Sequence, residues 1–259
     1  MKHLGTIATV SLAMALGATA QATTIGPDAY GYIAADVSYA WEDISGTGKL
    51  VLTSDDDAYA TEDLDFAFNF YGQEYTKVYW STNGLVTFGG SSTQFTNQDL
   101  TSAGATWTYD GPSIAALWDD WKSTTFVGDG TYYETRGTPG SRRFIIQWSL
   151  MQHYDDGVGR HEITFQALLY EGSGSILLQY KDVAVGHTGI DNGLSATVGI
   201  RDTAGQTNGR NLQWSYNQAV IGNGTSILFS GPVPEPVTLT GLITGIGCLA
   251  GYVRRRQIT

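Results

Sequence analysis

Two consecutive carboxylates in the run Trp118-Asp119-Asp120-Trp121 are the most concentrated chemical feature of the sequence. They follow the apolar segment 114–118, and in an extended chain Asp119 and Asp120 would point to opposite faces. One of them could bind calcium or lie beside a ligand. The more ordinary interpretation is that the pair ends a strand and accepts hydrogen bonds from turn amides. The sequence leaves open whether Asp119 or Asp120 binds calcium.

Paired carboxylates can also cleave glycosidic bonds when they lie about 5 to 9 Å apart. The chain has 25 acidic residues, which are too many for the sequence alone to single out such a pair. A second acidic run, Asp55-Asp56-Asp57, lacks the D-x-D-x-D-G spacing of a calcium loop. We therefore expect a solvated loop at that run.

Three histidines, His153, His161 and His187, are the other candidates for catalysis or metal binding. His153 and His161 flank Asp155-Asp156-Gly157, which is typical of a loop between strands. Their spacing is not that of a zinc site, and the sequence has neither an H-E-x-x-H motif nor a G-x-S-x-G nucleophile elbow. We expect solvated histidines, no catalytic residue, no metal site, no cofactor and no enzyme activity.

Charge and cysteine content restrict the partners. The chain has 25 acidic and 14 basic residues, and Lys2 and Arg254 to Arg256 lie near its ends, so the central part is strongly acidic. Nucleic acid is a poor partner for such a surface, because phosphate binding depends on clustered Lys and Arg. The single cysteine, Cys248, lies in an apolar tail, so the central part has no disulfide and must be stabilised by its core.

The elements that must position these side chains are strands. Leu64, Phe66, Phe68 and Phe70 alternate with polar or small residues, which is the period-2 pattern of a half-buried strand. Asn83-Gly84 is a strong hairpin signal between two apolar segments. No window in the central part shows a convincing helical period. Further expected strands lie at 114–118, 143–148, 162–170, 176–180, 196–200 and 226–229.

We therefore predict an all-β protein with a single β-sandwich of about ten strands over residues 23–232. Two stretches, 89–108 and 202–217, are rich in Ser, Thr, Asn and Gln and are expected to be longer loops. Such loops on a rigid sandwich often carry the binding surface. The many Trp and Tyr residues are explained first by core and cross-strand packing, although aromatic faces also stack on sugar rings.

The amino end has the features of a secretory signal peptide. Lys2 supplies a positive start, a short apolar run follows, and Ala20-Gln21-Ala22 forms an A-x-A cleavage site. We expect signal peptidase to remove residues 1–22, so that the mature chain begins at Thr23 and is exported.

The carboxyl end, residues 233–259, has three parts. Pro234, Glu235 and Pro236 come first, residues 237–253 carry no charge, and Arg254, Arg255 and Arg256 follow. Seventeen uncharged residues in a helix span roughly 25 Å, enough for a thin bilayer core. The three arginines are expected to stay in the cytoplasm. The segment is therefore a predicted C-terminal transmembrane helix.

This order of motif, apolar helix and arginine cluster resembles the PEP-CTERM sorting signal. The resemblance implies processing by an exosortase in a Gram-negative bacterium that makes exopolysaccharide. It also implies a transient anchor in the inner membrane, followed by release to the cell surface or the extracellular matrix.

A second resemblance covers residues 65–200. Its motifs are Phe66-x-Phe68-x-Phe70-Tyr71-Gly72, then Ser81-x-Asn83-Gly84, Ile114-Ala115-x-x-Trp118-Asp119-Asp120, Arg143-Phe144-x-x-x-Trp148, Phe165-Gln166-x-x-Leu169-Tyr170-Glu171 and Ala196-Thr197-Val198-Gly199-Ile200. They are similar to an accessory β-sandwich module of secreted bacterial proteins and, more distantly, to the nidogen extracellular domain. The resemblance implies no chemistry for the module.

The sequence thus predicts an exported, tail-sorted, non-enzymatic surface or matrix module that either has a structural role or associates with exopolysaccharide. One alternative is a secreted hydrolase that acts on glycan, which would need a deep cleft with converging carboxylates or histidines. The other is an adhesion module that binds a protein, which would need an exposed apolar patch or an open strand edge.

Overall fold

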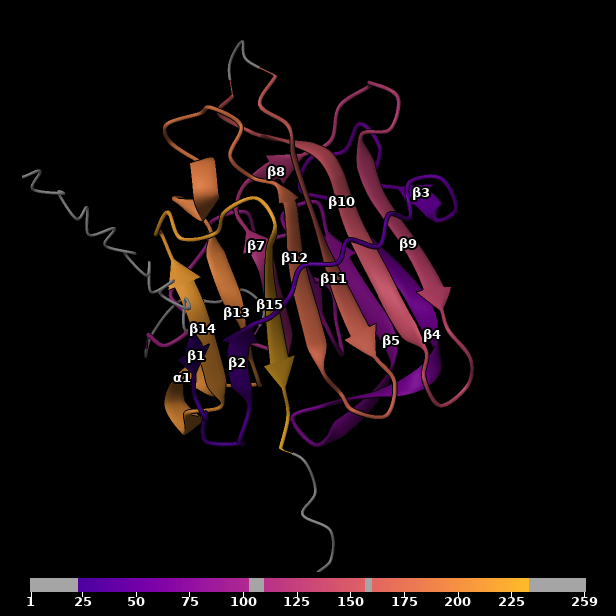
Figure 1. The fold of residues 1–259 in the computed structure, drawn as a ribbon, viewed down its shortest axis with the longest axis vertical. Coiled ribbons are helices and arrows are strands. Elements are labelled where there is room, and N and C mark those ends of the chain that lie inside the picture. Colours follow the sequence, from indigo (N-terminus) through magenta and orange to yellow (C-terminus); the bar gives the residue numbers. More distant parts are fainter. Residues whose placement is uncertain (1–22, 103–109, 157–159, 233–259) are drawn as a thin grey trace, which may run out of the picture.

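The computed structural model describes residues 23–102, 110–156 and 160–232. These residues form two antiparallel sheets that lie one in front of the other (Figure 1). The nine-stranded sheet contains, in spatial order, β1 (Thr24–Ile25), β2 (Ile33–Asp36), β15 (Thr225–Ser230), β12 (Ile176–Asp182), β11 (Ile163–Tyr170), β10 (Arg143–His153), β9 (Gly130–Arg136) and β3 (Lys49–Val51), with β8 (Trp121–Lys122) paired to β10. The six-stranded sheet contains β14 (Asn211–Tyr216), β13 (Thr197–Arg201), β7 (Ser113–Trp118), β6 (Leu85–Thr87), β5 (Gln73–Ser81) and β4 (Tyr59–Phe70).

The main core lies between the sheets and explains the alternating patterns. In β4, Leu64 and Phe66 are buried while Asp65 between them is exposed. Indole groups also bridge the two layers through hydrogen bonds. The Trp148 Nε1 of β10 donates to the Ser81 carbonyl of β5 at 2.8 Å. Burial of these aromatic faces supplies the main driving force for the stacking of the two sheets.

The expected fold class is confirmed, since the described residues are all-β with two sheets that pack as a sandwich. The hairpin at Asn83-Gly84 is confirmed by the antiparallel pairing of β5 with β6. The expected strands at 162–170 and 176–180 are confirmed as the antiparallel pair β11 and β12. Glycine is required at Gly84, because its φ is +76° and an added Cβ would lie 2.5 Å from the Leu117 carbonyl oxygen.

Two details of the prediction are wrong. About ten strands were expected, and the described residues contain fifteen, with β1, β2, β3, β8, β9 and β14 unforeseen. Residues 202–217 are not one long loop, because they contain a short helix, α1 (Gly205–Asn208), and strand β14. The polar side chains of β14 are compatible with a strand because it lies at the sheet edge and pairs only with β13. Of the other expected loop, 89–108, the described part (89–102) contains no strand or helix.

Residues 37–48, which we call the strap, join β2 to β3 by crossing the outer face of the nine-stranded sheet (Figure 1). Val37 N donates to the Ser226 carbonyl of β15 at 3.0 Å, at one side of the sheet. Ile44 N donates to Gln147 Oε1 of β10 at 3.1 Å, toward the other side. Ile44 is fully buried there, in a small second core. The strap therefore closes an outer face that would otherwise be open.

A row of buried polar side chains lies beneath the strap. Gln147, Gln166, Gln179 and Ser226 occupy matching register positions on β10, β11, β12 and β15. The side-chain amides of Gln166 and Gln179 are hydrogen-bonded to each other at 2.7 Å, and that of Gln179 is hydrogen-bonded to Ser226 Oγ at 2.9 Å. Gln147 instead accepts a hydrogen bond from Ile44 N of the strap. These hydrogen bonds offset the cost of burying the four polar groups.

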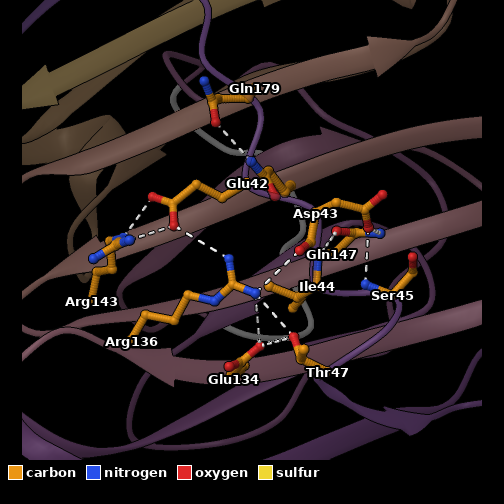
Figure 2. Close-up of polar contacts among 11 residues, drawn as sticks. Glu42, Asp43, Ile44, Ser45, Thr47, Glu134, Arg136, Arg143, Gln147 and Gln179 are labelled. Atoms are coloured by element: carbon orange, nitrogen blue, oxygen red, sulfur yellow. Dashed lines mark hydrogen bonds and ion pairs between the residues drawn. The ribbon is translucent and has the colours of Figure 1, made fainter.

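Charged side chains fasten the middle of the strap (Figure 2). The Glu42 carboxylate of the strap accepts hydrogen bonds from Nε and Nη2 of Arg143 on β10. It also lies 3.6 Å from Arg136 of β9, whose Nη2 donates to the Asp43 carbonyl at 3.1 Å. These ion pairs and hydrogen bonds close the outer face of the nine-stranded sheet.

Among the described residues, no helix is long and apolar enough to cross a membrane. The predicted signal peptide with Ala20 and Ala22, the motif at Pro234, Glu235 and Pro236, the segment 237–253 and Arg254 to Arg256 all lie outside the described residues.

Candidate functional site

A hollow lies at the end of the sandwich where β7 and β10 finish. Its volume is about 540 Å³, and an adjoining hollow of about 280 Å³ shares Phe95 and Asp120 with it. We call the two together the acidic depression. The side chains that line it include Asp56, Asp57, Phe95, Asn97, Asp119, Asp120, His153, Tyr154, Leu194 and Ser195.

Asp119 is buried at the acidic depression, with 6% of its surface exposed, and its carboxylate contacts several neighbouring groups. Its Oδ1 accepts a hydrogen bond from the Asp120 amide at 3.0 Å and lies 3.4 Å from His153 Nε2. Its Oδ2 accepts a hydrogen bond from the Ser195 hydroxyl. The bond from the Asp120 amide agrees with the ordinary interpretation of this pair as a strand-ending turn.

The order of these groups determines what chemistry they could do. In a hydrolytic triad the imidazole lies between serine and carboxylate, so that it can take the serine proton. Here the carboxylate of Asp119 lies between Ser195 and His153, and the Ser195 hydroxyl donates to the carboxylate. This order holds two side chains in place but gives Ser195 no adjacent imidazole base.

Pairing of β8 with β10 positions the neighbouring groups. His153 lies opposite Trp121 in this ladder, and the Tyr154 amide donates to the Asp120 carbonyl at 2.9 Å. His153 is the last residue of β10, and its side chain is only 12% exposed. The expectation of a solvated loop histidine is therefore wrong for His153, because the turn after β7 covers its ring.

The pKa of His153 reflects two opposing causes. Burial alone would lower it, but the hydrogen bond and charge of Asp119, together with the charge of Asp120, raise it above its ordinary value. The folded protein therefore favours the protonated imidazolium more than the environment of an exposed histidine does.

Asp120 points to a different set of neighbours, Asp56 and Asp57, and the three residues offer oxygen atoms within 4.8 Å of one another. Burial raises the pKa of Asp120 to about 6, and the negative charges of Asp57 and Asp56 add to this effect. Burial and the charge of Asp57 also raise the pKa of Asp56. Carboxylate oxygens of this kind are the ligands that Ca²⁺ prefers. The run at 55–57 is thus not an isolated loop, because it meets Asp120.

Aromatic side chains form the rim. Phe95 is 45% exposed and Tyr154 is 54% exposed, with Leu194 at 38% beside them. The segment that carries Phe95 is fixed to the six-stranded sheet, because the Gln94 carbonyl accepts from Trp118 Nε1 at 2.7 Å and Asn97 Nδ2 donates to Asn217 Oδ1 at 2.8 Å. The sequence attributed aromatic residues first to the core, and these rim residues are exceptions.

The other two histidines lie outside the depression. His161 Nδ1 is 2.9 Å from Asp156 Oδ1, and the rings of His161 and His187 have centroids 5.0 Å apart. The side chains of Asp156, His161 and His187 offer possible metal-ligating atoms within 4.8 Å of one another. No metal site was expected because the spacing of the histidines along the sequence matches no metal motif. That spacing does not show that two loops bring these side chains together in the fold.

The two stacked sheets, with an open polar depression at one end, form a β-sandwich module. The family model described as NIDO related matches residues 31–233, and the chain belongs to this family. The distant nidogen likeness is thereby confirmed over a longer range than the motifs at 65–200. Membership indicates an extracellular module with a structural or binding role. No curated protein and no solved structure matches the chain.

Proposed function

We propose that the protein is a non-enzymatic module of the bacterial cell surface or extracellular matrix and that its acidic depression binds exopolysaccharide. The observation that carries the proposal is the combination of exposed Phe95 and Tyr154 with the polar groups of Asp120 and Asn97. A sugar ring presents C–H faces that stack on aromatic rings and hydroxyl groups that donate to carboxylate and amide oxygens. Sites with an apolar wall and a few placed polar groups are typical for small polar ligands.

The sequences of the two ends of the chain also support a location at the cell surface or in the extracellular matrix. The A-x-A site at Ala20 and Ala22 predicts cleavage by signal peptidase, and the tail with Pro234, Glu235 and Pro236 resembles an exosortase substrate. In this proposal the helix at 237–253 holds the precursor in the inner membrane of a Gram-negative host until sorting. Exopolysaccharide would then be the most abundant polymer around the mature protein.

Retention on the host's own exopolysaccharide tests this proposal. The full chain, purified in mild detergent, is passed over immobilised polymer beside a Phe95→Ala/Tyr154→Ala variant. We expect the variant to bind at least about tenfold more weakly, which corresponds to about 1.4 kcal/mol. The matched control is Tyr39→Ala, because Tyr39 is an exposed aromatic on the strap, away from the depression. Equal retention of all three proteins would contradict the proposal.

A glycan-active hydrolase is the second candidate, and Asp120 is the observation that favours it. A carboxyl group with a pKa of about 6 beside other carboxylates resembles a general acid beside a nucleophile or base. If this candidate is right, the chain releases reducing ends from the polymer and Asp120→Asn abolishes the release. We rank it second because the depression is open and the buried Asp119 is already occupied by Ser195 and His153.

A protein-binding adhesion module ranks third. The outer strand of the six-stranded sheet, β4, carries Asp63 and Asp65 on its exposed face, and Asp63 pairs with Lys77 at 3.0 Å. Charges along an edge strand disfavour the addition of a further strand.

A further inference from the structure

Three metal-ligating side chains from two separate loops meet beside the acidic depression. Asp156 follows β10, His161 precedes β11, and His187 lies between β12 and the short 3₁₀ helix η1 (Asp191–Gly193). One ligand atom from each lies within 4.8 Å of the others. The two imidazole rings are nearly perpendicular, with an angle of 69° between their planes.

Asp156 and His161 are fixed relative to each other. The Asp156 side chain is only 2% exposed. Its Oδ2 accepts from the His161 amide at 3.0 Å, and its Oδ1 lies 2.9 Å from His161 Nδ1. Burial opposes ionisation of Asp156, but the hydrogen bonds and charge of His161 and the charge of His187 lower its pKa below the ordinary value. Asp156 is therefore a carboxylate at neutral pH.

His187 is held by its own loop. Its carbonyl accepts from the amides of Ile190 and Asp191, at 3.2 and 3.0 Å. The Asp191 carboxylate in turn accepts from the amides of Val185 and Gly186, at 2.8 and 3.0 Å. The backbone on both sides of His187 is thus organised before any ligand arrives, which lowers the ordering cost of binding.

The donor set selects a class of metal ion. Two imidazoles and one carboxylate suit Zn²⁺ and similar divalent transition metals, whereas Ca²⁺ prefers oxygen ligands alone. Asp156 Oδ1 and His161 Nδ1, 2.9 Å apart, are close enough to bind the same ion.

We propose that Asp156, His161 and His187 bind one divalent transition metal ion and so link the loop after β10 to the loop after β12. Three protein ligands leave a fourth tetrahedral position for water or an outside group. His187 Nδ1 now accepts from the Gly189 amide at 3.2 Å. Binding through Nε2 of His187 places the ring proton on Nδ1 and ends that contact, so the Gly189 amide should report on the metal.

Zinc chloride is the probe for this site. The full chain in mild detergent is stripped with EDTA, dialysed and titrated with Zn²⁺ by calorimetry at pH 7.5. We expect one equivalent to bind and a higher Tm with zinc than without. His161→Ala and His187→Ala should each weaken binding at least tenfold, and His187→Gln repeats the test with a side chain of closer size.

His153→Ala and Asp120→Asn are the matched controls, since both residues belong to the acidic depression and should leave zinc binding unchanged. Circular dichroism of each metal-free variant separates loss of ligand from loss of fold. The proposal is overturned if the wild type binds no zinc, or if His187→Ala and His187→Gln both bind it as tightly as the wild type does. The glycan proposal stands or falls separately, because retention on polymer is measured on metal-free protein.

Discussion

His153 Nε2 lies 3.4 Å from Asp119 Oδ1, at the point where the last residue of β10 meets the turn after β7. The pKa of His153 is raised, because the hydrogen bond and charge of Asp119 more than offset the opposing effect of burial. A raised folded-state pKa stabilises the fold below the unfolded-state pKa of about 6.5, and this stabilisation is lost as pH rises through the folded-state value.

His153→Gln should therefore destabilise the protein more at pH 5.5 than at pH 8.5. Glutamine keeps a polar side chain at this position but carries no charge. Urea unfolding of the wild type and the variant at both pH values measures the difference. If the loss of unfolding free energy is the same at the two pH values, the imidazolium pair with Asp119 is not formed in solution.

Asp120 should behave in the opposite way, because ionisation is unfavourable there. Its pKa is raised to about 6 by burial and by the charges of Asp57 and Asp56, so the ionised form costs stability above pH 6. Asp120→Asn should raise Tm at pH 7.5, and this gain should shrink below pH 6 and vanish near pH 4. Asp65→Asn, at an exposed position of β4, is the control. A gain from Asp120→Asn that does not change with pH would contradict the repulsion among the three carboxylates.

The strap should be essential for stability because Ile44 fills a separate small core. It is fully buried against Tyr132, Ile145 and Leu168 on the outer face of the nine-stranded sheet. Ile44→Ala should lower the free energy of unfolding by about 2–5 kcal/mol, as is usual for large-to-small changes in a core. Val37→Ala, at a partly exposed strap position, should cost under about 1 kcal/mol. A loss below about 1 kcal/mol for Ile44→Ala would show that the strap is only loosely attached.

The proposed sorting of the precursor can be tested with a substitution in the carboxyl-terminal tail, residues 233–259. Replacing Arg254, Arg255 and Arg256 together by Ser removes three charges that oppose translocation of the apolar segment 237–253. We expect less precursor in the inner-membrane fraction and more released into the periplasm. Fractionation of cells that lack exosortase separates anchoring from later processing. Unchanged membrane retention of the precursor would count against the tail interpretation.

Strong local signals allowed most of the sandwich to be predicted. The alternation of Phe66, Phe68 and Phe70 and the Asn83-Gly84 turn are set by the pleat and by backbone conformation, which act over a few residues. Strand β14 was missed because an edge strand needs little apolar content. Strand β9 was missed because Tyr132 is buried beneath the strap, which makes both faces of the strand partly apolar and hides the alternation.

The candidate site was only half visible in the sequence. Asp119 and Asp120 stood out as a pair, but Ser195, which binds Asp119, is 76 residues further along the chain. Phe95 and Asp57 also reach the depression only because several loops meet at one end of the sandwich. The meeting of loops also brings His187 next to His161, although the two residues are not close in the sequence. Residues of a site that is formed by several loops can be far apart in the sequence, so local motifs reveal only some of them.

The measurement that tests the central claim most directly is calorimetric titration of the full chain with oligosaccharides prepared from the host's exopolysaccharide, with reducing ends assayed in the same cell after the titration. We predict saturable binding that Phe95→Ala/Tyr154→Ala weakens at least about tenfold, with no new reducing ends. New reducing ends that disappear in Asp120→Asn would contradict the claim and establish a hydrolase, and the absence of any heat of binding would remove glycan recognition altogether.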